Sequence, residues 1–96
     1  MTVTRLIVEG GTLLRFPPHV KFRFDQIRDR WVVLAPERLL LPDELAVEIL
    51  HLVDGTNRVD DIVDALMVKF SAQREEIVID VTALLQDLAD KGTLVA

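Results

Sequence analysis

The pattern of apolar and polar residues predicts two short strands in the first half of the chain. Apolar and polar positions alternate after residue 19, so that Val20, Phe22 and Phe24 share one face of an extended segment. Residues 31–34 form a second, more apolar run, and Asp29–Arg30 are placed to turn the chain into it. The pattern is typical of a meander of half-buried strands.

A third strand is predicted at the rim of the same sheet. Pro36 has no backbone N–H, and proline is tolerated in sheets at edges and bulges. Residues 37–41 are therefore expected to form a short edge strand.

From residue 42 onward the apolar spacing changes to that of three amphipathic helices. The first is expected to begin near Pro42–Glu44 and to be stopped by Gly55 in left-handed backbone. The second is expected after Asn57, a good N-cap, and the third from Ser71 to about Lys91. The predicted inward-facing residues of the first two helices are Ala46, Ile49, Leu50, Val53, Val59, Ile62, Val63, Leu66 and Phe70.

The third helix carries more apolar surface than one core contact requires. At about 100° per residue, its predicted core stripe consists of Ile77, Val81, Leu84 and Leu88. A second apolar stripe, about 60 to 100° further round, consists of Val78, Leu85 and Ala89. The second stripe is either the wall of a binding site or a contact for the N-terminal segment or for Leu94–Val95.

These elements predict an α+β fold, a small winged helix-turn-helix-like domain with a three-stranded antiparallel sheet followed by three helices. Residues 18–96 are expected to form this domain, since Pro17–Pro18 interrupts any strand ladder. Residues 1–17 are an N-terminal extension with two open interpretations. They form a hairpin around Gly10–Gly11, or they are a flexible tail.

Composition indicates where the protein is located in the cell and shows that its two halves differ in charge. The 96 residues include no cysteine, which excludes disulfides and thiolate metal sites, and no stretch has the apolar length of a signal or membrane-spanning segment. A soluble cytoplasmic protein is expected. Residues 1–42 carry seven basic and four acidic residues, whereas residues 43–91 carry four basic and twelve acidic residues.

The sequence is poor in catalytic side chains. It contains one serine, no tyrosine and two histidines, His19 and His51, which are both expected at the surface. The carboxylates of Asp60, Asp61 and Asp64 are explained by the first turn and the solvated face of the second helix. No enzyme activity, metal site or cofactor is predicted.

Two binding functions fit the predicted fold. A winged helix-turn-helix protein would read nucleic acid with the third helix, but this helix region has two bases and five acids between Ser71 and Lys91. We therefore expect neither nucleic-acid nor membrane binding. Alternatively, an extended peptide adds as a strand beside residues 37–41 and lays its side chains against the third helix. The same exposed edge could instead pair two copies of the protein in a homodimer.

The run from Trp31 to Arg38, followed by Asp54–Gly55 and Asp80–Val81 at fixed distances, resembles the PqqD family. The resemblance covers about residues 18–95 and also includes Ala46, Ile49, Leu50, Ile62, Val63, Leu66, Leu84, Leu85 and Leu88. It implies a RiPP recognition element, a non-catalytic peptide chaperone of pyrroloquinoline quinone (PQQ) biosynthesis. Its implied partners are the ribosomal precursor peptide and the radical S-adenosylmethionine (SAM) enzyme that joins a Glu and a Tyr of that peptide.

The resemblance also implies where the peptide binds. By the family's mode it lies beside the third strand and the third helix. In this sequence those positions are Arg38, Leu39, Leu40, Leu41, Val78, Val81, Leu85 and Leu88. Trp31 is interpreted as a core anchor and Asp54–Gly55 as a helix stop. The chain departs from the family at Val53, where many members have cysteine, and residues 1–17 match no family motif.

Overall fold

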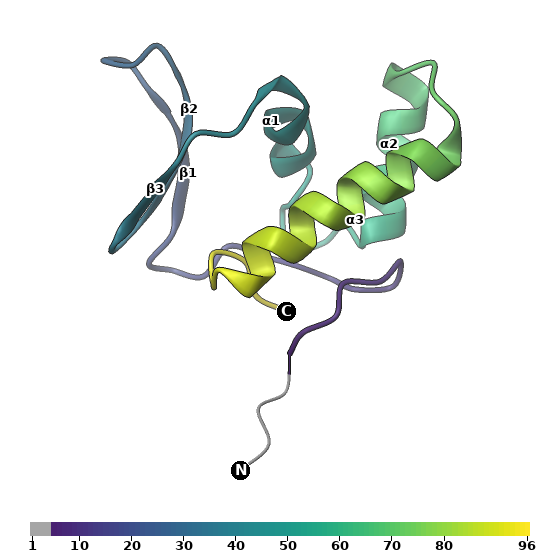
Figure 1. Cartoon of the computed structure of the whole chain (residues 1–96), viewed down its shortest axis with the longest axis horizontal. Coiled ribbons are helices and arrows are strands. Elements are labelled where there is room, and N and C mark those ends of the chain that lie inside the picture. Colours follow the sequence, from purple (N-terminus) through teal and green to yellow (C-terminus); the bar gives the residue numbers. More distant parts are fainter. Residues whose placement is uncertain (1–4) are drawn as a thin grey trace.

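The computed structural model describes residues 5–96, and the first four residues of the predicted extension lie outside the described part. Three antiparallel strands in the order β1-β2-β3 precede three helices, which confirms the predicted α+β fold (Figure 1). The elements are β1 (Lys21–Asp25), β2 (Arg30–Ala35), β3 (Arg38–Leu40), α1 (Glu44–His51), α2 (Val59–Lys69) and α3 (Arg74–Asp90).

The sheet turns one apolar face toward the helices. Phe22 of β1 pairs with Val33 of β2, and Val33 pairs with Leu40 of β3, so these three side chains share a face. Val33 is buried in the main core cluster, and the other two are half-buried against it. Figure 1 shows the sheet on one side of the molecule and the helices on the other, with the C-terminal end of α3 directed toward the sheet.

The predicted helix starts are close to the observed ones. Asp43 caps α1, because its side chain accepts a hydrogen bond of 2.8 Å from the Ala46 backbone N–H. The N-cap of α2 is Arg58, one residue later than predicted, and the Asn57 side chain instead donates to the Leu52 carbonyl at 3.0 Å. The N-cap position of α3 is Gln73, two residues after the predicted Ser71, and its side chain makes no capping hydrogen bond.

The core joins all three helices to the sheet. Every predicted inward-facing residue of α1 and of the turn after it is buried, and so are those of α2 with the exception of Phe70, which is 36% exposed at its C-terminal end. The buried residues of α3 are Ile77, Val81, Leu85 and Leu88. None of the helices described between residues 5 and 96 has the length and apolar content to cross a bilayer.

The N-terminal segment is built into the core. Val8 and Leu14 are both buried in the main cluster. The carbonyls of Gly10 and Thr12 accept hydrogen bonds from the first-turn N–H groups of α2, and Arg15 exchanges two hydrogen bonds with Val95. The turn and the arm that follows it therefore pair with the start of α2 and with the C-terminal end of the chain.

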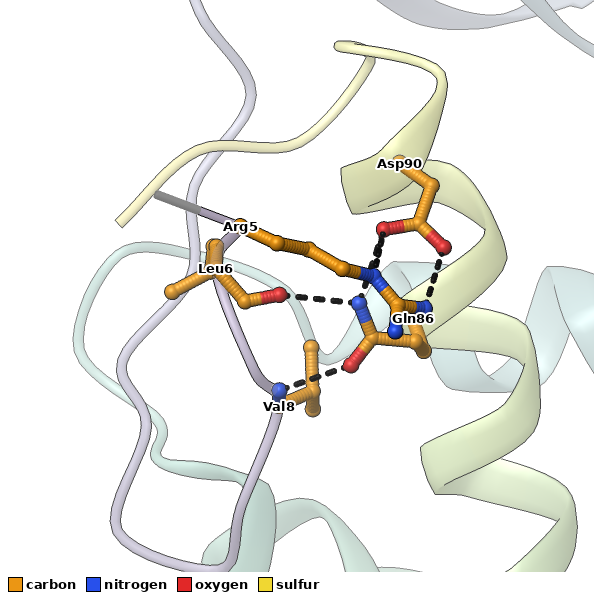
Figure 2. A network of polar contacts seen from close by, with 5 residues as sticks. All are labelled: Arg5, Leu6, Val8, Gln86 and Asp90. Carbon is orange, nitrogen blue, oxygen red and sulfur yellow. Dashed lines mark hydrogen bonds and ion pairs between the residues drawn. The ribbon is translucent and has the colours of Figure 1, made fainter. Parts of the chain in front are cut away.

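The same segment is attached to α3 through the side chains of Gln86 and Asp90 (Figure 2). The Gln86 side chain accepts a hydrogen bond from the Val8 N–H at 2.8 Å and donates one to the Leu6 carbonyl at 2.9 Å. It also donates a hydrogen bond to the Asp90 carboxylate. Asp90 in turn forms a bidentate ion pair with Arg5, at 2.8 and 2.6 Å. The hydrogen bond from Arg5 lowers the pKa of the Asp90 carboxyl below its ordinary value. One face of α3 is thus covered by residues 5–8.

Candidate functional site

An open groove runs between the end of the sheet and α3. Its volume is about 450 Å³. One wall is formed by the chain from β3 into α1, and the opposite wall by the C-terminal half of α3. The wall and floor residues are Val33, Leu40, Leu41, Pro42, Asp43, Leu45, Ala46, Ile49, Leu50, Asp80, Ala83, Leu84, Asp87, Leu88 and Lys91.

The groove lies beside a strand that has a neighbour on only one side. β3 is the last strand of the sheet and pairs with β2 alone. An edge strand of this kind presents unpaired N–H and C=O groups, which another extended chain can use. The strand edge offers backbone hydrogen-bond partners, and the groove offers apolar contacts, to one and the same added chain.

The groove wall exposes large apolar side chains. Leu41 is 50% exposed and Leu45 is 40% exposed, although both are aliphatic. Leu84, on the opposite wall, is half-buried against the core. Contiguous exposed apolar surface of this kind marks binding sites in soluble proteins.

Of the three aspartates that line the groove, two have a partner within the chain. Asp43 is engaged as the cap of α1, and Asp87 forms an ion pair of 2.7 Å with Lys91. Asp80 has no hydrogen-bond or ion-pair partner among residues 5–96. The lining therefore combines hydrocarbon walls with one uncompensated carboxylate, which suits the holding of a ligand.

Comparison with known proteins identifies the family. The family model described as coenzyme PQQ synthesis protein D (PqqD) matches residues 30–94. The PqqA binding protein of Rhodopseudomonas palustris (strain BisB5) is 60% identical over 94 residues, which cover 98% of this chain and 92% of that protein. The chain belongs to the PqqD family. The resemblance seen in the sequence is thereby confirmed.

Two solved structures of PqqD proteins have the same fold. The solution structure of the PqqD part of Methylobacterium extorquens PqqCD, described as a functional, stand-alone RiPP recognition element, is 38% identical with a TM-score of 0.78. That match covers 93% of this chain and 95% of the other. The crystal structure of PqqD from Xanthomonas campestris is 35% identical with a TM-score of 0.59, and the match covers 83% and 89%.

In this PqqD-family chain, the site residues predicted on β3 lie along the exposed edge. Leu40 and Leu41 line the groove. Arg38 and Leu39 are exposed but are not part of its lining. Leu39 pairs with Leu34, so its side chain is on the sheet face opposite to that of Leu40.

The site residues predicted on α3 fall in three different places. Leu88 lies at the floor of the groove and is 4% exposed, while Val81 and Leu85 are fully buried in the core. Val78 is 37% exposed and does not line the groove. Of the neighbouring pair Leu84 and Leu85, only Leu84 lines the groove, because Leu85 is fully buried.

The N-terminal segment explains why Leu85 is buried while Leu84 lines the groove. Leu84 and Leu85 are about 100° apart around the helix axis, one on each flank of the core direction. The N-terminal segment adds Val8 and Leu14 to the core cluster that contains Leu85, and Gln86 anchors it to α3. Because this covers the Leu85 flank, the Leu84 flank is the one that remains open. Of the predicted second stripe, Leu85 and Ala89 thus pack on the core, while Val78 stays 37% exposed.

The remaining predicted residues have structural roles. Trp31 is half-buried, and its ring lies 4.9 Å from that of Phe22 and 4.5 Å from that of His51. His51 is exposed, as expected, but it packs on this aromatic pair. Asp61 accepts a hydrogen bond from the Arg58 backbone N–H, and Asp64 forms an ion pair with Arg74.

Asp54–Gly55 form a tight turn after α1. The Asp54 carboxylate accepts hydrogen bonds from the N–H groups of Thr56 and Asn57, and these bonds lower its pKa. Gly55 has a φ of 83°, in the left-handed region. The helix itself ends earlier, at His51, so Gly55 completes the turn rather than the helix.

Proposed function

We propose that this chain binds PqqA, the precursor peptide of PQQ, as an extended strand added to β3 in the groove along α3. The observation that carries the proposal is the coincidence of an unpaired strand edge with an open, apolar groove. Relatives named PqqA binding protein and the solved RiPP recognition element support it. The groove lies between residues 33 and 91, within the domain expected over residues 18–96.

The energetics of strand addition explain why the groove is needed. Each added backbone hydrogen bond contributes about 0.5 to 1.5 kcal/mol net, while ordering a flexible peptide costs about 2 to 5 kcal/mol. β3 has only three residues, so backbone bonds alone leave little surplus. Apolar side chains of the guest, buried against Leu41, Leu45 and Leu84, supply the rest.

The chain acts as an adaptor in this proposal. It holds PqqA and presents it to a radical SAM enzyme in the cytoplasm, as the family resemblance implies, while the chemistry belongs to the partner enzyme. The site residues are expected to be Leu40, Leu41 and Leu88 from the original prediction, joined by Leu84 and Leu45. Arg38 and Leu39 would contribute through their backbone at the strand edge.

Calorimetric titration with PqqA tests the site. Leu41→Glu places a charge in the groove wall and is expected to weaken binding about tenfold or more, since it removes one apolar contact and adds an unpaired carboxylate. Ile27→Glu is the matched control, because Ile27 is 96% exposed at the tip of the β1–β2 hairpin. Equal affinities of the two variants and the wild type would contradict the proposed groove.

A further inference from the structure

A second, more apolar cavity lies beyond the end of the groove. Its volume is about 310 Å³. It is enclosed by the start of α1, the C-terminal end of α2 and the N-terminal half of α3. The residues that line it are Leu45, Leu66, Phe70, Ala72, Ile77, Asp80 and Val81. Asp80 is the one charged side chain of this lining.

The groove and the second cavity are adjacent. Leu45 and Asp80 belong to the lining of both, so together they form the ridge between them. Leu84 in the groove and Ile77 in the second cavity are seven residues apart on α3, roughly 10 Å along its axis. An extended peptide covers that distance in about three residues.

The ridge offers a charge that nothing in the described chain neutralises. The carboxylate of Asp80 has no ion-pair or hydrogen-bond partner among residues 5–96. Around it, Leu45 is 40% exposed and Phe70 is 36% exposed. A guest that complements this surface needs a positive charge at the ridge and an apolar side chain beyond it.

We infer that the bound peptide continues past the groove, pairs a basic side chain with Asp80 and inserts a bulky apolar side chain into the second cavity. This inference rests on the proposed peptide-binding function and adds a sequence requirement to it. The guest carries an apolar residue opposite Leu84, a Lys or Arg near the ridge, and an apolar anchor about three residues away from the first. An anchor of this kind in a pocket carries much of the affinity in protein–peptide recognition.

Filling the cavity tests the apolar anchor. Ala72→Phe is expected to occupy the cavity and to weaken PqqA binding about tenfold or more in calorimetric titration, because the guest loses one buried apolar side chain. Ala65→Phe is the matched control, since Ala65 is exposed on α2 and lines neither cavity. Ala65→Phe is expected to bind like the wild type.

Removing the charge at the ridge tests the basic residue. Asp80→Asn is expected to weaken PqqA binding about two- to fivefold at low salt and to make the affinity less dependent on salt, as for an exposed ion pair. Glu75→Gln changes the net charge equally on the same helix, outside both cavities, and is expected to change neither. Equal salt dependence of Asp80→Asn and the wild type would overturn the ion pair.

A measurement on the unmodified chain keeps the test valid if Ala72→Phe does not fold. In methyl NMR spectra, PqqA is expected to shift the Ile77 signal but not that of Ile27. Suppose that Leu41→Glu abolishes binding, the Ile77 signal does not shift and Ala72→Phe binds like the wild type. The second cavity is then not used and the inference is overturned, while the proposed binding in the groove is retained. If none of these changes has an effect, the proposed function fails as well. Self-association that Ala72→Phe abolishes, seen by sedimentation without peptide, would assign the cavity to a second copy and overturn the inference.

Discussion

Leu84 and Leu85 are neighbours on α3 with different surroundings. Leu85 is fully buried in the core, whereas Leu84 is half-buried in the groove wall. Leu85→Ala is expected to lower the free energy of unfolding by about 2 to 5 kcal/mol, because it leaves a cavity in the core. Leu84→Ala is expected to cost less than about 2 kcal/mol of stability and to weaken PqqA binding instead.

Urea unfolding and calorimetric titration of both variants separate the two roles. A stable Leu85→Ala protein with impaired binding would contradict the placement of these residues. Periodicity placed Leu84 in the core stripe and Leu85 in the second stripe, and the structure shows the reverse, with Leu85 fully buried and Leu84 half-buried. Which of the two is buried depends on the N-terminal segment, which comes from nearly 80 residues earlier in the sequence.

Asp54 makes the stability of the turn after α1 depend on pH. Its pKa is lowered from the ordinary 3.8 by N–H groups of Thr56 and Asn57, so the folded chain binds fewer protons near that pH than the unfolded chain. The stabilisation is therefore present above pH 3.8 and is lost as the pH falls through the lowered pKa. The pKa of Asp25 is lowered by hydrogen bonds from Arg28, and that of Asp90 by its hydrogen bond from Arg5. Both groups therefore change stability with pH in the same direction as Asp54.

Thermal unfolding between pH 2 and pH 7, roughly the range in which carboxylates titrate, checks this effect. The melting temperature of the wild type is expected to fall most steeply below about pH 4. Asp54→Asn is expected to melt at a lower temperature than the wild type near neutral pH and to approach it in acid. Melting curves that stay parallel at every pH would show that Asp54 contributes nothing through its charge.

At the scale of elements, the N-terminal segment is the part whose structure could not be predicted from the sequence. Local patterns predicted the strands and helices because each has a periodic apolar face and its own start or stop residues. Residues 5–16 lack a periodic face. Their structure depends on partners in α2, in α3 and at the C-terminal end, which no local pattern reveals.

Gln86 is expected to be the main attachment of that segment to α3. Gln86→Ala removes the hydrogen bonds to the Val8 N–H and the Leu6 carbonyl, and the expected loss of stability is about 1 to 3 kcal/mol. PqqA affinity is expected to stay the same, because Gln86 lies outside the groove lining. Chemical unfolding together with titration measures both. A large loss of affinity at unchanged stability would place the guest peptide on the opposite face of α3.

At the scale of the whole molecule, the groove arises where three predicted elements meet, β3, α1 and α3. The edge position of β3 was predictable from Pro36, and the apolar excess of α3 from its spacing. Which flank of α3 faces β3 was not predictable, because it depends on how the sheet packs against α1 and on what covers the other flank. The family resemblance pointed to the third strand and the third helix, and the structure shows an open groove between them, lined by Leu84 rather than Leu85.

The sheet has two edges, and only one of them borders the groove. β1 forms the other edge, and none of its residues lines the groove. A two-residue turn is flanked by a hydrogen-bonded pair, here Ala35 and Arg38, and the next pair is not hydrogen-bonded. Leu39, in that next pair, therefore directs its N–H away from β2 and toward an added strand. Binding by strand addition therefore predicts an effect at β3 and none at β1.

The most direct test of peptide capture at β3 is the mapping of backbone amide signals by NMR during titration with PqqA. The largest shifts are expected in residues 38–45 and in the half of α3 from Asp80 to Lys91, with slower hydrogen exchange at the Leu39 amide. The amides of β1 and of residues 5–9 are expected to change little. Shifts confined to β1 or to the N-terminal segment, with β3 unaffected, would contradict the account.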